Sequence, residues 1–251
     1  MLARVLGLLP EVVGFHEPKP WLNVEAYLSW SGKRDSDWLR RRLGRRRDGL
    51  IEQVRASGLG YVESSHFLSH LIPELQDRYE ARFIHLYRDG RDFVRSGLGR
   101  NWYRRSRVDE WVKTQIRRTF ALDLGFSWAD HRLDPPGRLR SRFERIAWLW
   151  AEINGVILRG LERVPPGRVE SVRVEDFGED TVRRLSRFLG FELEENLLKR
   201  MLGVAARRPN RTRRYRAASP DAWSDRQIEQ FYAIAGEMYE RLGYADPVHE
   251  V

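Results

Sequence analysis

Residues 83–96 read FIHLYRDGRDFVRS, and this stretch decides the fold that the sequence predicts. The first part, residues 83–87, is a short apolar run of the kind that a buried parallel strand carries. Arg88 follows the run directly, a glycine-containing turn comes next, and a helical pattern begins near Arg91. Because such a helix folds back over the sheet, Ser96 can face the space beyond the strand end. The stretch therefore allows a guanidinium and a hydroxyl to converge on a doubly charged phosphate, with helix N–H groups adding to the field. The alternative from these residues alone is a surface arginine and a solvated helix serine.

Other short apolar runs and helical patterns alternate along the chain. The runs are Val12 to Phe15, Gly60 to Val62 and Val169 to Val174, and the helical patterns span residues 143–161, 182–189 and 228–242. Gly190 is a plausible stop for the second of these helices, and Ser224 with Gln227 fits a capping box before the third, which Gly243 ends. The alternation predicts an α/β fold with an open parallel sheet covered by helices on both faces, in a single domain over residues 1–251.

Polar residues follow each expected strand. They are His16 and Glu17, residues 64–66, residues 88–92, and Glu175 with Asp176. In open α/β sheets, ligands bind at the carboxyl ends of the strands. The pattern therefore predicts one ligand site at that end of the sheet.

Composition limits the function classes. The formal net charge is +9, and only four of the 45 basic residues are lysine. Arginine suits bidentate contacts to phosphate or sulfate, although a GC-rich genome would also enrich it. The absence of cysteine excludes disulfides and thiolate chemistry and suits a cytoplasmic location. No apolar run approaches the ~20 residues of a membrane span, and no metal-ligand cluster is visible.

Residues 83–96 resemble the 3′-phosphate motif of the PAPS-dependent sulfotransferases. That motif is a strand, then Arg-Asp-x-Arg-Asp, then a serine eight positions after the first arginine, and residues 88–92 with Ser96 match it in full. The resemblance covers essentially the whole chain through Trp148, Asn154 and the segments 172–177, 188–190 and 242–244. It implies a P-loop-NTPase-like sulfotransferase fold that uses 3′-phosphoadenosine 5′-phosphosulfate (PAPS) as co-substrate without a metal. The acceptor would be a hydroxyl or amine on a small molecule or carbohydrate.

Two residues are candidates for the base that takes the acceptor's proton. Residues 10–18 resemble the segment that places a glutamate at the reaction centre of several family members, which indicates Glu17. Residues 64–66 resemble the Lys-Thr-His segment of other members, which indicates His66, although Ser64 replaces the lysine. The sequence leaves both candidates open.

Residues 211–215 are similar to a Lys-Gly-Arg loop that closes over the cofactor in some carbohydrate sulfotransferases. The match implies that Arg211 and Arg213 contact the PAPS phosphates, although Thr212 replaces the glycine and a solvated basic loop is the alternative.

The family's first strand and phosphosulfate loop have no counterpart, because residues 1–10 resemble the helix that follows that loop. The sequence is therefore expected to be either a truncated enzyme or a short form that binds PAP, another nucleotide or a partner without catalysis.

The acceptor region is expected within residues 97–136, where Trp102, Tyr103, Trp111 and Trp128 either stack on an acceptor or belong to the core. The sequence does not identify the acceptor or the oligomeric state. The basic run in residues 38–47 is expected to be a solvated helix face, with a nucleic-acid surface as the alternative.

Overall fold

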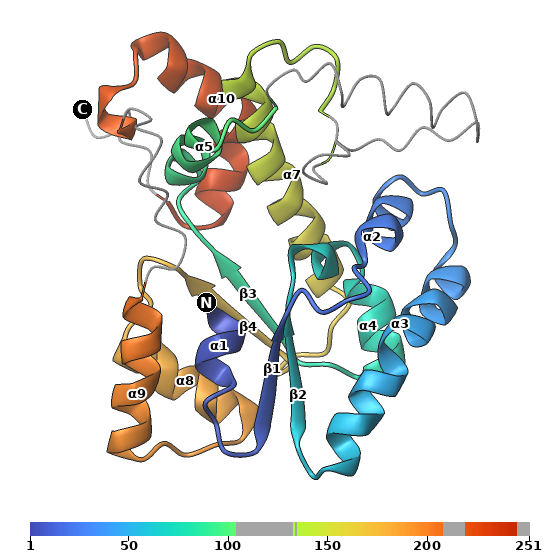
Figure 1. The fold of residues 1–251 in the computed structure, drawn as a ribbon. Coiled ribbons are helices and arrows are strands. Elements are labelled where there is room, and N and C mark those ends of the chain that lie inside the picture. Colours follow the sequence, from blue (N-terminus) through green and yellow to red (C-terminus); the bar gives the residue numbers. More distant parts are fainter. Residues whose placement is uncertain (104–132, 134, 208–218, 245–251) are drawn as a thin grey trace. The chain divides into compact units, whose positions relative to one another are not determined.

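The computed structural model describes residues 1–103, 133, 135–207 and 219–244 (Figure 1). The chain divides into two units. The first contains the described parts of residues 1–87 and 157–211, and the second contains the described parts of residues 88–156 and 212–251.

The first unit contains the four strands that the sequence predicted. They are β1 (Val12–His16), β2 (Gly60–Ser64), β3 (Phe83–Tyr87) and β4 (Val169–Arg173). β1 pairs with β2 and β3 pairs with β4, both in parallel, so the strands and their parallel direction are confirmed. One continuous open sheet is not confirmed, because the ladders of the described residues join the strands in two separate pairs.

Helices lie on two sides of the strands of the first unit (Figure 1). α1 (Leu2–Leu6), α8 (Glu179–Leu189) and α9 (Glu195–Ala206) lie on one side. α3 (Ser36–Ala56) and α4 (Ile72–Tyr79) lie on the other, joined to β1 and β2 through α2 (Asn23–Trp30) and the 3-10 helix η1 (His66–His70). α8 ends at Gly190 as predicted, and this residue adopts a φ of 95°, which suits glycine.

Two larger apolar clusters, beside a smaller one of Ile72, Leu161 and Val164, hold the described part of the first unit together. The first gathers side chains of α1, β1, α8 and α9, and Val172 of β4 joins it. The second gathers α2, α3 and η1 around Leu43 and Leu71. α1 lies so close to β1 that a Cβ built on Gly14 would stand 2.0 Å from the carbonyl oxygen of Ala3. Only a residue without a side chain fits at that point of the strand.

The second unit is built from helices around an aromatic core. It contains α5 (Gly90–Gly99), most of α7 (Arg142–Leu161), the 3-10 helix η2 (Pro220–Ala222) and α10 (Asp225–Arg241). Trp150, Phe231 and Tyr239 are buried with ring centroids 5.5–6.3 Å apart. The predicted capping box is confirmed, because Ser224 and Gln227 bond reciprocally at the start of α10. No helix in the described ranges is long and apolar enough to cross a membrane.

Candidate functional site

The two candidate bases form a hydrogen-bonded pair in the first unit. Glu17 directly follows β1, and His66 opens η1 two residues after β2. The register of the two strands sets His16 opposite Ser64, so the segments that leave the strands start side by side. Nδ1 of His66 lies 2.7 Å from Oε1 of Glu17, and both side chains reach solvent, at 52% and 31% exposed.

The backbone around this pair is fixed by short-range bonds. The N–H of Glu17 donates to the carbonyl oxygen of Ser64 at 3.1 Å, and Nδ1 of His16 lies 3.0 Å from the same oxygen. Ser65 caps η1 by accepting from the N–H of Phe67 at 3.2 Å. Glu17 itself has a φ of 48°, in the left-handed region that non-glycine residues rarely adopt. Such a conformation persists only where the surroundings impose it.

Residues 88–96, the part of the predicted phosphate-binding stretch that follows β3, form the turn and the start of α5 in the second unit. α5 begins at Gly90, one residue before the position that the sequence indicated, and Asp89 caps it by accepting from the N–H of Arg91 at 2.7 Å. The Asp89 carboxylate also pairs with the Arg91 guanidinium at 2.8 Å and accepts from the Tyr239 hydroxyl at 3.1 Å. Burial raises the pKa of Asp89, but its bonds to Arg91 outweigh burial and leave the pKa below its ordinary value. Asp89 and Arg91 therefore stabilise the turn.

Arg88 points along one face of α5. Its carbonyl oxygen accepts from Nε1 of Trp150 at 3.0 Å, which holds the backbone in place. Its guanidinium Nη2 lies 3.8 Å from Oδ2 of Asp92, and the side chain is 34% exposed. Asp92 and Ser96 are four residues apart in one helix, so they share a face. Arg88, Asp92 and Ser96 therefore lie along one face of α5, hereafter the α5 face.

Other predicted site residues have mixed outcomes. Trp102 packs against Phe93, with ring centroids 5.2 Å apart, and its carbonyl oxygen accepts from Arg142 at 2.8 Å, so it has the contacts of a core residue. The Tyr103 hydroxyl donates to the carbonyl oxygen of Leu133 at 2.7 Å. The remaining ones lie outside the described residues: Arg211, Arg213, Trp111 and Trp128.

The basic run is confirmed as part of a helix, α3, but its arginines are not all solvated. Arg40 pairs with Asp77 at 2.7 Å, and Arg42 and Arg46 lie 2.8 and 3.4 Å from Oε1 of the buried Glu25. The prediction of a solvated face is wrong for Arg47, which is buried and pairs with Glu63 of β2. The carboxylate within a strand attracts this arginine inward, and sequence reasoning missed it.

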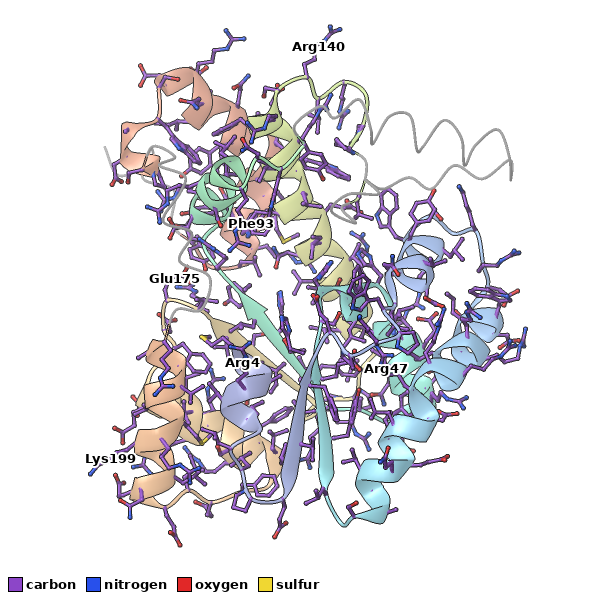
Figure 2. The ribbon with its side chains drawn as sticks, in the orientation of Figure 1. Arg4, Arg47, Phe93, Arg140, Glu175 and Lys199 are labelled. Atoms are coloured by element: carbon purple, nitrogen blue, oxygen red, sulfur yellow. The ribbon has the colours of Figure 1, made fainter. Side chains whose placement is uncertain are left out.

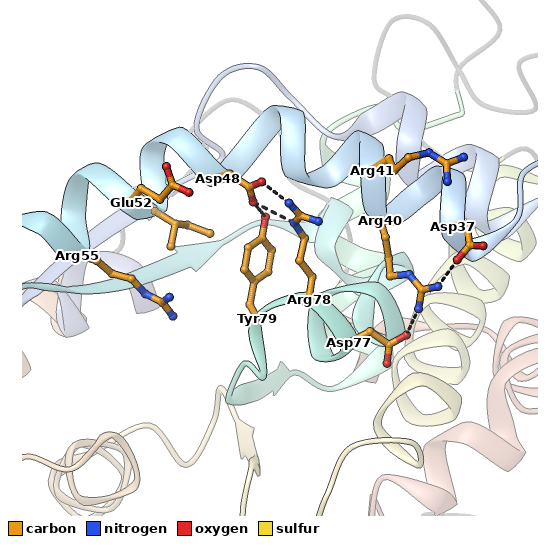
Figure 3. A pocket seen from close by; sticks show the side chains of 10 residues that line it. Asp37, Arg40, Arg41, Asp48, Glu52, Arg55, Asp77, Arg78 and Tyr79 are labelled. Atoms are coloured by element: carbon orange, nitrogen blue, oxygen red, sulfur yellow. Dashed lines mark hydrogen bonds and ion pairs between the residues drawn. The ribbon is translucent and has the colours of Figure 1, made fainter.

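A charged cavity lies between α3 and α4, and neither Glu17 nor His66 is among the residues that line it (Figure 3). Its volume is about 610 Å³, and its lining includes Arg78 and Asp48, which pair with each other, and Tyr79, whose hydroxyl donates to Asp48 at 2.8 Å. Four acidic and four basic side chains line it, so their formal charges balance. The cavity therefore shows no preference for an anionic or a cationic ligand. In the part of the chain that the structure describes, no three His, Cys, Asp or Glu side chains group as metal ligands.

No protein-family model matches the chain, and no curated protein is similar to it. Among solved structures, the chain is similar to a sulfotransferase domain from the curacin biosynthetic pathway. The TM-score is 0.50 and the identity 13%, over 98% of this chain and 93% of that one. At this identity the likeness concerns the fold. The chain therefore has a mixed α/β fold similar to that of a sulfotransferase domain.

Proposed function

We propose that the protein is a sulfotransferase that moves a sulfuryl group from PAPS to a hydroxyl or amine acceptor. The observation that carries the proposal is the α5 face, where Arg88, Asp92 and Ser96 align directly after the parallel strand β3. The similarity of the fold to a sulfotransferase domain supports it. We further propose one sulfotransferase domain over residues 1–251, with the acceptor bound by residues 97–136.

The α5 face suits the 3′-phosphate of an adenine nucleotide. The Arg88 guanidinium lies 3.8 Å from Asp92 and its side chain is 34% exposed, so a doubly charged phosphate can reach it from solvent. The serine hydroxyl adds a neutral donor one turn further along the helix. The start of α5 adds the positive end of the helix dipole. In this proposal Arg211 and Arg213 would contact the PAPS phosphates as well.

The pair of Glu17 and His66 suits the proton transfer. The acceptor oxygen or nitrogen attacks sulfur, and the bond between sulfur and the bridging oxygen of the 5′-phosphate breaks, so PAP leaves with that electron pair. Nε2 of His66 takes the acceptor's proton, while Nδ1–H donates to Glu17 and the carboxylate stabilises the imidazolium that forms. In this scheme Glu17 orients the base instead of competing with it.

The direct test is calorimetric titration with PAP. We expect Arg88→Ala to weaken PAP binding about 10- to 100-fold, since it removes a hydrogen-bonded charge. Ser96→Ala should weaken it less, because the lost donor is neutral. Arg100→Ala is the matched control: it removes one positive charge at the exposed end of the same helix and should leave PAP binding unchanged. If Arg88→Ala binds PAP as tightly as the unmodified chain, the phosphate site is not on the α5 face.

A second measurement separates the enzyme from a non-catalytic nucleotide-binding protein. Transfer of labelled sulfate from PAPS to a panel of hydroxyl and amine acceptors supports the enzyme. PAP binding that depends on Arg88, without transfer to any acceptor, supports the non-catalytic alternative.

A further inference from the structure

We propose that Arg47 is a positioning residue that holds Glu17 and His66 in the geometry needed for proton transfer. This inference rests on the proposed function. Arg47 lies on α3, on the side of the helix that faces β2, and is labelled in Figure 2. It would act on the two candidate bases through the segments that carry them.

One guanidinium binds both segments. Nε and Nη2 of Arg47 donate to the two carboxylate oxygens of Glu63 at 2.8 and 3.0 Å. Nη1 donates to the carbonyl oxygen of Pro20 at 2.9 Å, and Nη2 lies 3.3 Å from that of Pro18. Arg47 therefore ties the loop after β1 to the end of β2 and to α3.

Burial makes these contacts restrictive. The side chains of Arg47 and Glu63 are 3% and 5% exposed, and the Tyr61 hydroxyl donates to Glu63 at 2.5 Å. A buried charge pair must keep its partners, because water cannot replace them. The fork of an arginine also accepts only a narrow range of partner directions. Glu63 fixes the orientation of the guanidinium, and the guanidinium in turn fixes the carbonyl groups of Pro18 and Pro20.

The Arg47 contacts lie close in sequence to both Glu17 and His66. Pro18 follows Glu17 directly, and Glu63 precedes Ser64, whose carbonyl oxygen accepts from the N–H of Glu17. Glu17 has the left-handed φ of 48°, which its surroundings must impose. The Arg47 contacts supply that constraint from the loop side, and the Ser64 carbonyl supplies it from the strand side. The carboxylate of Glu17 is thereby aimed at Nδ1 of His66.

A purely structural arginine would be buried in the same way, so the test needs a signal from His66 itself. Long-range ¹H–¹⁵N correlation spectra report which ring nitrogen carries the proton, and His66→Gln assigns the signal. In the unmodified chain we expect the Nδ1–H tautomer, because Glu17 accepts from that nitrogen. In Arg47→Lys a charge remains beside Glu63, but one ammonium cannot also bond both proline carbonyls. We expect this variant to fold and to shift His66 toward the Nε2–H tautomer.

The matched control is Arg45→Gln, an exposed position on the same helix, which should leave the His66 signals unchanged. The double variant Arg47→Met with Glu63→Gln leaves no unpaired buried charge and should shift the tautomer in the same direction. A folded Arg47→Lys or double variant with unchanged His66 signals would overturn the proposal. If both variants unfold while Arg45→Gln folds, Arg47 serves stability alone, and the proposal is equally overturned.

Kinetics add a second readout. With an acceptor identified by the labelled-sulfate assay, we expect Arg47→Lys to lower kcat about 10- to 100-fold while KM for PAPS stays about the same, since only the position of the base changes. The tautomer measurement needs no turnover, so it remains decisive if the chain proves to lack transfer activity. Loss of PAP binding on Arg88→Ala tests the proposed function separately, because Arg88 belongs to the second unit and Arg47 to the first.

Discussion

Nδ1 of His66 lies 2.7 Å from Oε1 of Glu17, although 49 residues separate them in the chain. The parallel register of β1 and β2 produces this contact, because it sets the last residues of the two strands opposite each other. Two candidate bases that the sequence offered as alternatives therefore form one hydrogen-bonded pair. A pair that acts together makes a kinetic prediction that two independent residues do not make.

Removing either member of the pair should abolish most of the transfer activity. We expect Glu17→Gln and His66→Gln each to lower kcat about 10²- to 10⁴-fold, the range of general-base catalysis. The double variant should lose no more than the worse single variant, because residues that act as a unit are not additive. Steady-state kinetics with PAPS checks this, and PAP affinity, which belongs to the α5 face, should stay the same in all three. Additive losses would mean that the two residues act separately.

Gly14 should be irreplaceable in β1. A Cβ at this position would stand 2.0 Å from the carbonyl oxygen of Ala3, so α1 and β1 would have to separate. We expect Gly14→Ala to lower the free energy of unfolding by about 3 kcal/mol or more, the range of overpacking that moves backbone. Urea denaturation measures the change.

The control for this substitution is Gly49→Ala, in the middle of α3, where a Cβ would meet no atom within 4 Å. The same chemical change should raise the free energy of unfolding there by about 0.5–1 kcal/mol, because alanine favours the helix. A Gly14→Ala variant as stable as the unmodified chain would contradict the close packing of α1 on β1.

Much of the fold could be predicted from the sequence, because its signals are local. The four strands are short apolar runs, and the helix ends at Gly190 and Ser224 carry their own capping residues. The contact between Glu17 and His66 could not be predicted in the same way. It depends on which strands pair and in which register, and the apolar runs are equally compatible with other pairings. The sequence therefore indicated both residues without indicating that they meet.

The burial of Arg47 was indicated by its position in the sequence, but the neighbouring arginines concealed this. Leu39, Leu43 and Ile51 are buried, and Arg47 stands at the same spacing of four between Leu43 and Ile51. Residues four apart share a face of a helix, so this position belongs to the apolar stripe of α3. The many neighbouring arginines made a solvated face the simpler interpretation. A charged residue inside an apolar stripe predicts a buried partner, and here the partner is Glu63.

The stability of the chain should depend on His70 between about pH 4 and 6.5. Burial lowers the pKa of His70 from 6.5 to about 4, and the charge of His66 adds to this effect as the smaller cause. The unfolded chain then binds a proton that the folded chain does not bind, so stability is full above the unfolded pKa and falls as the pH decreases toward the folded one. We expect the free energy of unfolding to decrease by about 2 kcal/mol from this residue between about pH 7.5 and 5.

Urea denaturation of the unmodified chain and His70→Gln at the two pH values isolates this contribution, since the other titrating groups are common to both. The decrease toward low pH should be smaller in the variant. Equal decreases in both proteins would show that His70 titrates in the folded chain as it does in the unfolded one.

Asp89 should stabilise the second unit mainly through its charge. The residue caps α5, pairs with Arg91 at 2.8 Å and accepts from Tyr239. Asparagine can still cap the helix, so Asp89→Asn removes the ion pair and keeps the cap. We expect a loss of about 1–2 kcal/mol at neutral pH, because a partly buried, hydrogen-bonded charge is replaced by a neutral acceptor.

The direction of the Asp89 pKa shift determines how this loss of stability changes with pH. The pKa of Asp89 in the folded chain lies below its ordinary value, because its bonds to Arg91 outweigh the effect of burial. The stabilisation is therefore fully present above the unfolded pKa, about 3.9, and disappears as the pH falls through the lower folded value. Thermal unfolding of Asp89→Asn and the unmodified chain should converge at acidic pH. Asp225→Asn, an exposed change in the first turn of α10, should leave the melting temperature nearly unchanged throughout. A difference for Asp89→Asn that persists unchanged into acid would mean that the carboxylate contributes through its shape and not through its charge.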